Sequence, residues 1–255
     1  MVGRVMLNSA IYLNTLRSHV DTPVRLVIAG FLLLLLYLLV SGGVSVNATT
    51  MSGIGSLVMG GNSLLSMLVW LLGLGLISRD IASGSIQLVL LRPLSRASYV
   101  LSKWAALTSV GLIVLVMMYG TYLARHTMTI DSTVPVILLF AAQCVQVAAI
   151  AAVITFFSTV PMKFGELGLL ILSALLLLTL QLLNLRYGVA ILDAAVTLAW
   201  RILLPNVTIT PAFANGAYQE LIVGMALNSG VAVVGVAGAV GLMRWREFTY
   251  AEQGG

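Results

Sequence analysis

The stretch "LGLLILSALLLLTLQLL", residues 167–183, decides the fold class of this chain. It contains no charged residue, and its apolar and polar positions do not alternate. A strand of a membrane barrel would alternate over about ten residues, whereas a helix needs about 20 mostly apolar residues to cross a bilayer core. The stretch therefore predicts a membrane-spanning helix.

The composition of the whole chain agrees with this interpretation. Of 255 residues, 60% are hydrophobic and only 8% are charged, against about 25% charged residues in soluble domains. So few polar side chains could not form the exterior of a soluble protein. In a soluble protein the net charge of +5 would suggest nucleic acid, but here we expect membrane lipid and no nucleic acid as a partner. The single cysteine, Cys144, excludes an intrachain disulfide.

Six segments are long and apolar enough to span a membrane. They are residues 24–41, 54–77, 99–123, 134–157, 166–185 and 221–243. We therefore expect an all-α integral membrane protein with six transmembrane helices, forming one domain over residues 1–255. No large soluble domain fits between the spans.

The basic residues predict the orientation of these spans. With a cytoplasmic N-terminus, ten of the 13 Lys and Arg residues lie on the inside and three on the outside. The inside set is Arg4, Arg17, Arg25, Arg79, Arg92, Arg96, Lys103, Lys163, Arg244 and Arg246, and the outside set is Arg125, Arg186 and Arg201. Cytoplasmic loops carry the excess of basic residues in membrane proteins. We therefore expect a multi-pass protein with both termini in the cytoplasm. The expected location is a bacterial or archaeal inner membrane.

Two segments at the membrane surfaces do not fit the pattern of spans joined by tight loops. Residues 1–20 repeat apolar side chains at helical spacing and predict an amphipathic interfacial helix on the inner leaflet. Residues 186–220 lie outside, and their first half is too apolar for a solvated loop. Pro205 and Pro211 interrupt this segment. We expect it to form a re-entrant or interfacial helical region before the last span.

The cytoplasmic stretch "SRDIASGSIQLVLLRPLSRASYVLSKW", residues 78–104, combines charge with strong local signals. Ser78 or Asp80 can cap a short helix that Gly84 weakens or bends. Pro93 breaks the chain, and Ser95 is a good N-cap for a helix that continues into the third span. The pattern predicts a helical hairpin over residues 78–98, joined rigidly to two spans. Basic residues that only anchor the protein to lipid headgroups are the simpler alternative.

This stretch resembles the signature of the export-type ABC permeases of the type-two family, which have the type V transmembrane fold. In that family the segment reads as an acidic residue, Gly-Ser/Thr, an apolar run, Pro, Ser-Arg and Lys. The matching positions are Asp80, Gly84, Ser85, Leu90, Leu91, Pro93, Ser95, Arg96 and Lys103. The family more often has Glu where this chain has Asp80. The interfacial helix, the six predicted spans and the apolar region before the last span extend the resemblance along the chain.

The resemblance implies a permease subunit of an ATP-driven exporter. The matching residues, together with Arg92, would form a coupling helix that contacts a separate ABC ATPase subunit, present in two copies. A second permease copy or a sister permease would complete the pathway. No GxxxxGK[ST] phosphate loop occurs in the chain. ATP and Mg²⁺ would therefore be bound by the ATPase, and this chain would hold no cofactor and no catalytic residue.

Other polar residues have weaker predicted roles. Lys163 and Glu166 lie in a short cytoplasmic turn at i,i+3 spacing and are candidates for a second ATPase contact. Gln143 and Gln146 lie inside a predicted span, where bonding between helices is the expected role. His19 and His126 lie at opposite membrane edges without acidic partners, so we expect no metal site.

Three other functions compete with the exporter. An intramembrane serine protease would need a buried histidine, and both histidines lie at the edges of the predicted spans. A small secondary transporter would show charged residues at the midplane and inverted repeats, and neither is visible. A non-transporting membrane assembly or scaffold protein remains an alternative. The substrate stays open, although the nearly uncharged spans favour an apolar or amphipathic cargo.

Overall fold

A computed structural model describes the following parts of the chain: residues 8–20, 30, 65–66, 68–83, 86, 95–125, 130–160, 173, 175–182, 190–203, 205 and 218–253. Its named helices are α1 (Ser9–Val20), α4 (Ser78–Ala82), α6 (Arg96–Arg125), α7 (Ile130–Thr159), α9 (Ala190–Leu203) and α10 (Gln219–Gln253). These parts of the chain contain no strand. The prediction of an all-α protein is therefore confirmed.

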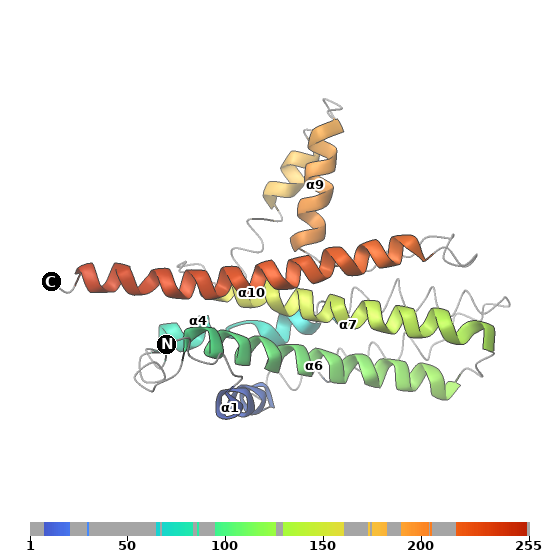
Figure 1. The fold of residues 1–255 in the computed structure, drawn as a ribbon, viewed down its shortest axis with the longest axis horizontal. Coiled ribbons are helices and arrows are strands. Elements are labelled where there is room, and N and C mark those ends of the chain that lie inside the picture. The colour runs from blue at the N-terminus through green and yellow to red at the C-terminus, as the bar shows by residue number, and fades with distance from the viewer. Residues whose placement is uncertain are drawn as a thin grey trace.

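Three helices are long and apolar enough to cross a membrane. They are the segments Arg96–Gly120 of α6, Val136–Thr159 of α7 and Gln219–Trp245 of α10. Figure 1 shows the three helices lying lengthwise beside one another. They indicate a membrane protein and match the third, fourth and sixth predicted spans. The other three predicted spans lie largely outside the described residues, although residues 68–73 and 175–182 are helical.

Helix α7 lies at the centre of the described bundle and α10 lies at its edge. The structure buries 61% of the apolar window of α7 but only 11% of the window of α10. Small residues allow the helices to approach, as is common where lipid removes the hydrophobic drive for helix association. A Cβ atom at Gly235 of α10 would lie 3.1 Å from the backbone carbonyl of Ala152 in α7. The two helices thus touch almost backbone to backbone at this point.

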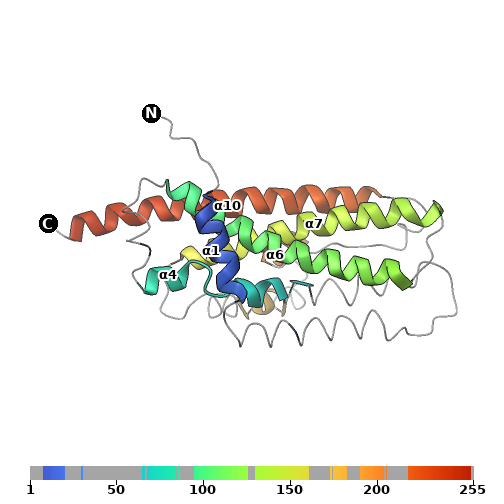
Figure 2. The same cartoon turned by 90° about the horizontal axis from the view of Figure 1, so that it is seen from below.

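Helix α1 crosses α6 instead of running parallel to the bundle, as Figure 2 shows. Thr15 is buried, with 2% of its surface exposed, whereas Leu13 is 61% exposed. The helix therefore turns one side toward α6 and leaves apolar surface on another side. This arrangement suits the predicted interfacial helix, whose residues 1–7 lie outside the described part of the chain.

Helix α9 projects away from the three long helices beside α10 (Figure 1). It ends at Leu203, two residues before the predicted break at Pro205. The carbonyl oxygen of Pro205 accepts a hydrogen bond of 3.0 Å from Nε2 of Gln146, which lies in the middle of α7. Pro205, which is buried, therefore lies against the interior of the bundle. Pro211 lies outside the described residues.

Candidate functional site at the start of α6

The first turn of α6 begins at a serine cap. The backbone N–H of Ser98 donates a hydrogen bond of 3.1 Å to Oγ of Ser95, and the N–H of Tyr99 donates to the Ser95 carbonyl oxygen at 3.1 Å. A serine side chain at this position satisfies a backbone donor that has no partner within the helix. The predicted N-cap at Ser95 is confirmed, and it defines the start of α6.

Two side chains of α6 meet at one carboxylate of α4, and we call the three residues the Asp80 cluster: Asp80, Tyr99 and Lys103. Nζ of Lys103 lies 2.9 Å from Oδ2 of Asp80. The hydroxyl of Tyr99 donates a hydrogen bond of 2.5 Å to the same oxygen. The side chains of Lys103 and Asp80 are 10% and 29% exposed. The carboxylate therefore neutralises a lysine that is almost completely buried.

Helix geometry explains how α6 contributes two members of the Asp80 cluster. Tyr99 and Lys103 are four residues apart, so they lie on the same face of the helix. Nζ of Lys103 also lies 5.7 Å from the centre of the Tyr99 ring, within the range of a cation–π contact. One face of α6 thus supplies a hydroxyl, an aromatic ring and an ammonium group to the single carboxylate on α4.

A sharp turn places α4, and with it Asp80, against α6. Gly75 has a φ of 78°, in the left-handed region that glycine adopts without strain. The N–H of Ile77 donates a hydrogen bond of 3.1 Å to Oγ of Ser158 in α7. Ile77 occupies the N-cap position of α4 and makes no side-chain cap hydrogen bond, so the prediction that Ser78 or Asp80 is the cap residue is wrong. The carboxylate of Asp80 binds Tyr99 and Lys103 instead.

Arg96 connects the start of α6 to α10. Its guanidinium Nη1 donates a hydrogen bond of 2.8 Å to the backbone carbonyl oxygen of Met243. The two residues are 147 positions apart in the sequence. The contact therefore joins the first turn of one spanning helix to the last part of another.

Helix α1 is attached to the same part of α6 by polar contacts. The backbone N–H of Asn8 donates to Oγ of Ser102 at 2.9 Å, and the Tyr12 hydroxyl donates to Oγ of Ser109 at 2.9 Å. The Asn8 side chain also caps α1, because its Oδ1 accepts from the N–H of Ala10 at 3.1 Å. Sequence reasoning missed these contacts. Ser102 and Ser109 are seven residues apart, and this spacing is the signal that could have indicated a polar stripe on α6.

The structure brings together part of the predicted coupling set. Asp80 and Lys103 are paired, and Ser95 and Arg96 lie in the same end of the bundle. The remaining predicted positions lie outside the described residues: Gly84, Ser85, Leu90, Leu91, Arg92, Pro93, Lys163 and Glu166. Tyr99 is a member of the site that the sequence did not single out. Its position one helical turn before Lys103 was the available signal.

The predicted interhelical role of Gln146 is confirmed. Its Nε2 donates to Oγ of Ser66 at 3.2 Å and to the Pro205 carbonyl oxygen at 3.0 Å. Gln146 and Gln143 are both fully buried. Among the described residues, no three His, Cys, Asp or Glu side chains gather closely enough to hold a metal ion.

No protein-family model and no curated protein matches this sequence. Direct contacts join α4, α6, α7, α10 and α1 at one end of the bundle. A displacement of α4 would therefore be transmitted to several helices at once.

Proposed function

We propose that this chain is the membrane-embedded permease subunit of an ATP-driven exporter of the ABC type. The observation that carries the proposal is the ion pair of 2.9 Å between Asp80 and Lys103. It attaches the short helix α4, at the start of the predicted coupling loop, to the 30-residue helix α6. The resemblance of residues 78–104 to the permease signature supports the same function.

In this proposal an ATPase subunit binds the cytoplasmic loop at residues 78–98. Closure of two ATPases around ATP and Mg²⁺ would move the loop, and the Asp80 cluster would pass the movement to α6. The Arg96 contact with Met243 would carry it to α10, and the Ile77 contact with Ser158 would carry it to α7. ATP can drive such a change only if it favours one of two arrangements through the partner.

Two further partners belong to the proposal. One chain would provide only half of the pathway. A second permease copy or a sister permease would supply the other half. The ATPase would supply the phosphate loop that this sequence lacks. The proposed location is the inner membrane, with both termini in the cytoplasm.

The test is co-expression of this chain with an ATPase that carries a phosphate loop and is encoded beside it. The two proteins are expected to co-purify, and reconstitution into liposomes should stimulate ATP hydrolysis. Combined Arg92→Ala, Ser95→Ala and Arg96→Ala substitutions should weaken both properties. Arg244→Ala, which changes an exposed arginine on α10, is the matched control. Unchanged complex formation and ATP hydrolysis in the triple variant would contradict the proposal.

A further inference from the structure

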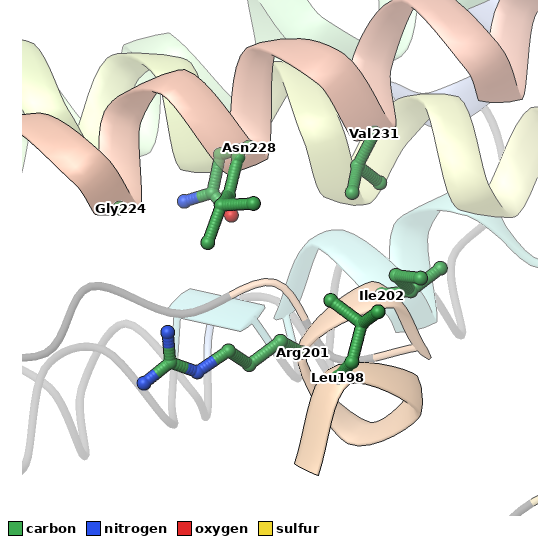
Figure 3. Close-up of a pocket in the computed structure, with 7 residues that line it drawn as sticks. Leu198, Arg201, Ile202, Gly224, Asn228 and Val231 are labelled. Carbon is green, nitrogen blue, oxygen red and sulfur yellow. The ribbon is translucent and has the colours of Figure 1, made fainter. Parts of the chain in front are cut away.

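A groove lies between α9 and the first half of α10, away from the Asp80 cluster. Its walls include Leu198, Arg201 and Ile202 from α9 and Gly224, Leu227 and Asn228 from α10. Figure 3 shows Asn228 pointing from α10 into the space between the helices, and Arg201 extending from α9 on the side of Gly224 and Asn228. We call this feature the α9–α10 groove.

Most of the groove wall is apolar and exposed. Leu198 is 49% exposed, Ile202 is 46% exposed and Leu227 is 39% exposed. A Cβ atom at Gly224 would meet no other atom within 4 Å. The absence of a side chain at this position therefore leaves open space along α10.

The groove lies within the length of α10 that is apolar enough to span a membrane. Asn228 is nine residues after Gln219, the first residue of this segment. At about 1.5 Å per residue, it lies roughly 14 Å along the helix. Arg201 lines the same groove, so its charge is held beside a membrane-spanning segment.

Arg201 carries a positive charge beside a membrane-spanning segment. An arginine among membrane-spanning helices is costly unless it pairs with an anion or reaches water. Arg201 is exposed, and none of the described side chains forms an ion pair with it. Asn228 is only 4% exposed and adds a polar amide without adding charge. The guanidinium of Arg201 is therefore available to an anionic molecule from the membrane.

We propose that the α9–α10 groove binds an anionic phospholipid of the surrounding membrane. The phosphate accepts hydrogen bonds from the guanidinium of Arg201, whose planar fork suits phosphate oxygens. An acyl chain lies along Leu198, Ile202 and Leu227. The net charge of the headgroup sets the preference, because a zwitterionic lipid brings its own cation close to the guanidinium of Arg201, whereas an anionic lipid does not. The site is independent of ATP-driven transport.

The experiment uses the purified full chain in detergent micelles with phosphatidylglycerol that carries a photoreactive group on its acyl chain. Matched phosphatidylcholine with the same acyl chain is the comparison. Mass spectrometry should locate the label in residues 198–202 and 224–231. Phosphatidylglycerol should label these segments about fivefold more than phosphatidylcholine, which corresponds to one arginine contact with an anionic lipid. Equal labelling by the two lipids would overturn the proposal.

Variants at Arg201 and Gly224 test separately how the charge and the shape of the groove contribute to lipid labelling. Arg201→Gln should lower phosphatidylglycerol labelling to the phosphatidylcholine level, whereas Arg244→Gln, at the other end of α10, should not change it. Gly224→Leu fills the groove and should reduce labelling by both lipids. Gly230→Leu is the control, because a Cβ atom there also meets nothing within 4 Å.

Two results with these variants would contradict the proposal. One is undiminished phosphatidylglycerol labelling of Arg201→Gln, and the other is an equal loss in Gly224→Leu and Gly230→Leu. Gel filtration confirms that each variant is folded. If Arg201→Gln does not fold, the comparison of the two lipids on the unsubstituted chain decides the question.

Discussion

Lys103 and Arg201 are both cations on apolar helices, but they differ in their partners. Lys103 is 10% exposed and pairs with the carboxylate of Asp80. Arg201 is exposed beside α10 and has no anionic partner among the described side chains. The buried pair can hold two helices together, whereas the open cation can attract a molecule from outside. The comparison teaches that the partner of a charge, more than its presence, indicates its role.

Removal of the Asp80 carboxylate, which pairs with Lys103, should have the largest effect on stability. Asp80→Asn leaves a buried ammonium without its anion, and this should lower the free energy of unfolding by about 2 kcal/mol. Thermal unfolding in detergent should show a midpoint lower by about 6 °C. Glu220→Gln, at an exposed position of α10, is the matched control. At roughly 3 °C per kcal/mol, a midpoint within about 1 °C of that of the unsubstituted chain would show that the ion pair does not stabilise the protein.

Loss of the Arg96 contact should have a smaller effect. Arg96→Met removes the hydrogen bond of 2.8 Å to the Met243 carbonyl oxygen but retains an apolar side chain, so we expect a loss of about 1 kcal/mol. Arg244→Met serves as the control on the adjacent position of α10. Equal destabilisation by the two substitutions would mean that the contact with Met243 is not responsible.

The Tyr99 hydroxyl should contribute less again. Tyr99→Phe keeps the ring that faces Lys103 and removes only the hydrogen bond to Asp80. Hydrogen bonds between membrane helices average about 0.6 kcal/mol, and we expect a loss of that size in thermal unfolding. In the Asp80→Asn background the same substitution should cost less, because the carboxylate acceptor is gone. If the losses of stability from Tyr99→Phe and Asp80→Asn were additive, the two residues would not interact in one cluster.

Arg201→Gln should have the smallest effect on the stability of the protein in detergent. Since Arg201 holds no ion pair with the described side chains, the free energy of unfolding should change by less than about 0.5 kcal/mol. Thermal unfolding of the same protein preparations used for Asp80→Asn measures this directly. A loss of stability as large as that caused by Asp80→Asn would contradict the proposed difference between Arg201 and Lys103.

Features with local signals were predictable from the sequence. Length and apolar composition predicted the helices α6, α7 and α10, and the serine before Arg96 predicted the cap of α6. Proline and apolar composition predicted a broken helical region where α9 lies. Each of these signals is contained in one continuous segment of chain.

Contacts between distant segments were not predictable in the same way. Asp80 and Lys103 are 23 residues apart, so no helical spacing brings them together, and only the turn at Gly75 and the packing of α4 do so. Local capping rules instead assigned Asp80 a role that the structure contradicts. The attachment of α1 through Ser102 and Ser109 also depends on a crossing of two helices that periodicity within either helix does not reveal.

The central claim is tested most directly by ATP hydrolysis after this chain is reconstituted with the proposed ATPase partner. The measurement compares Asp80→Lys alone with the exchanged pair Asp80→Lys and Lys103→Asp. If the ion pair transmits movement from the ATPase, the single substitution should abolish stimulation of hydrolysis and the exchanged pair should restore much of it. Full stimulation by the single variant, or no stimulation by the unsubstituted chain, would contradict the account.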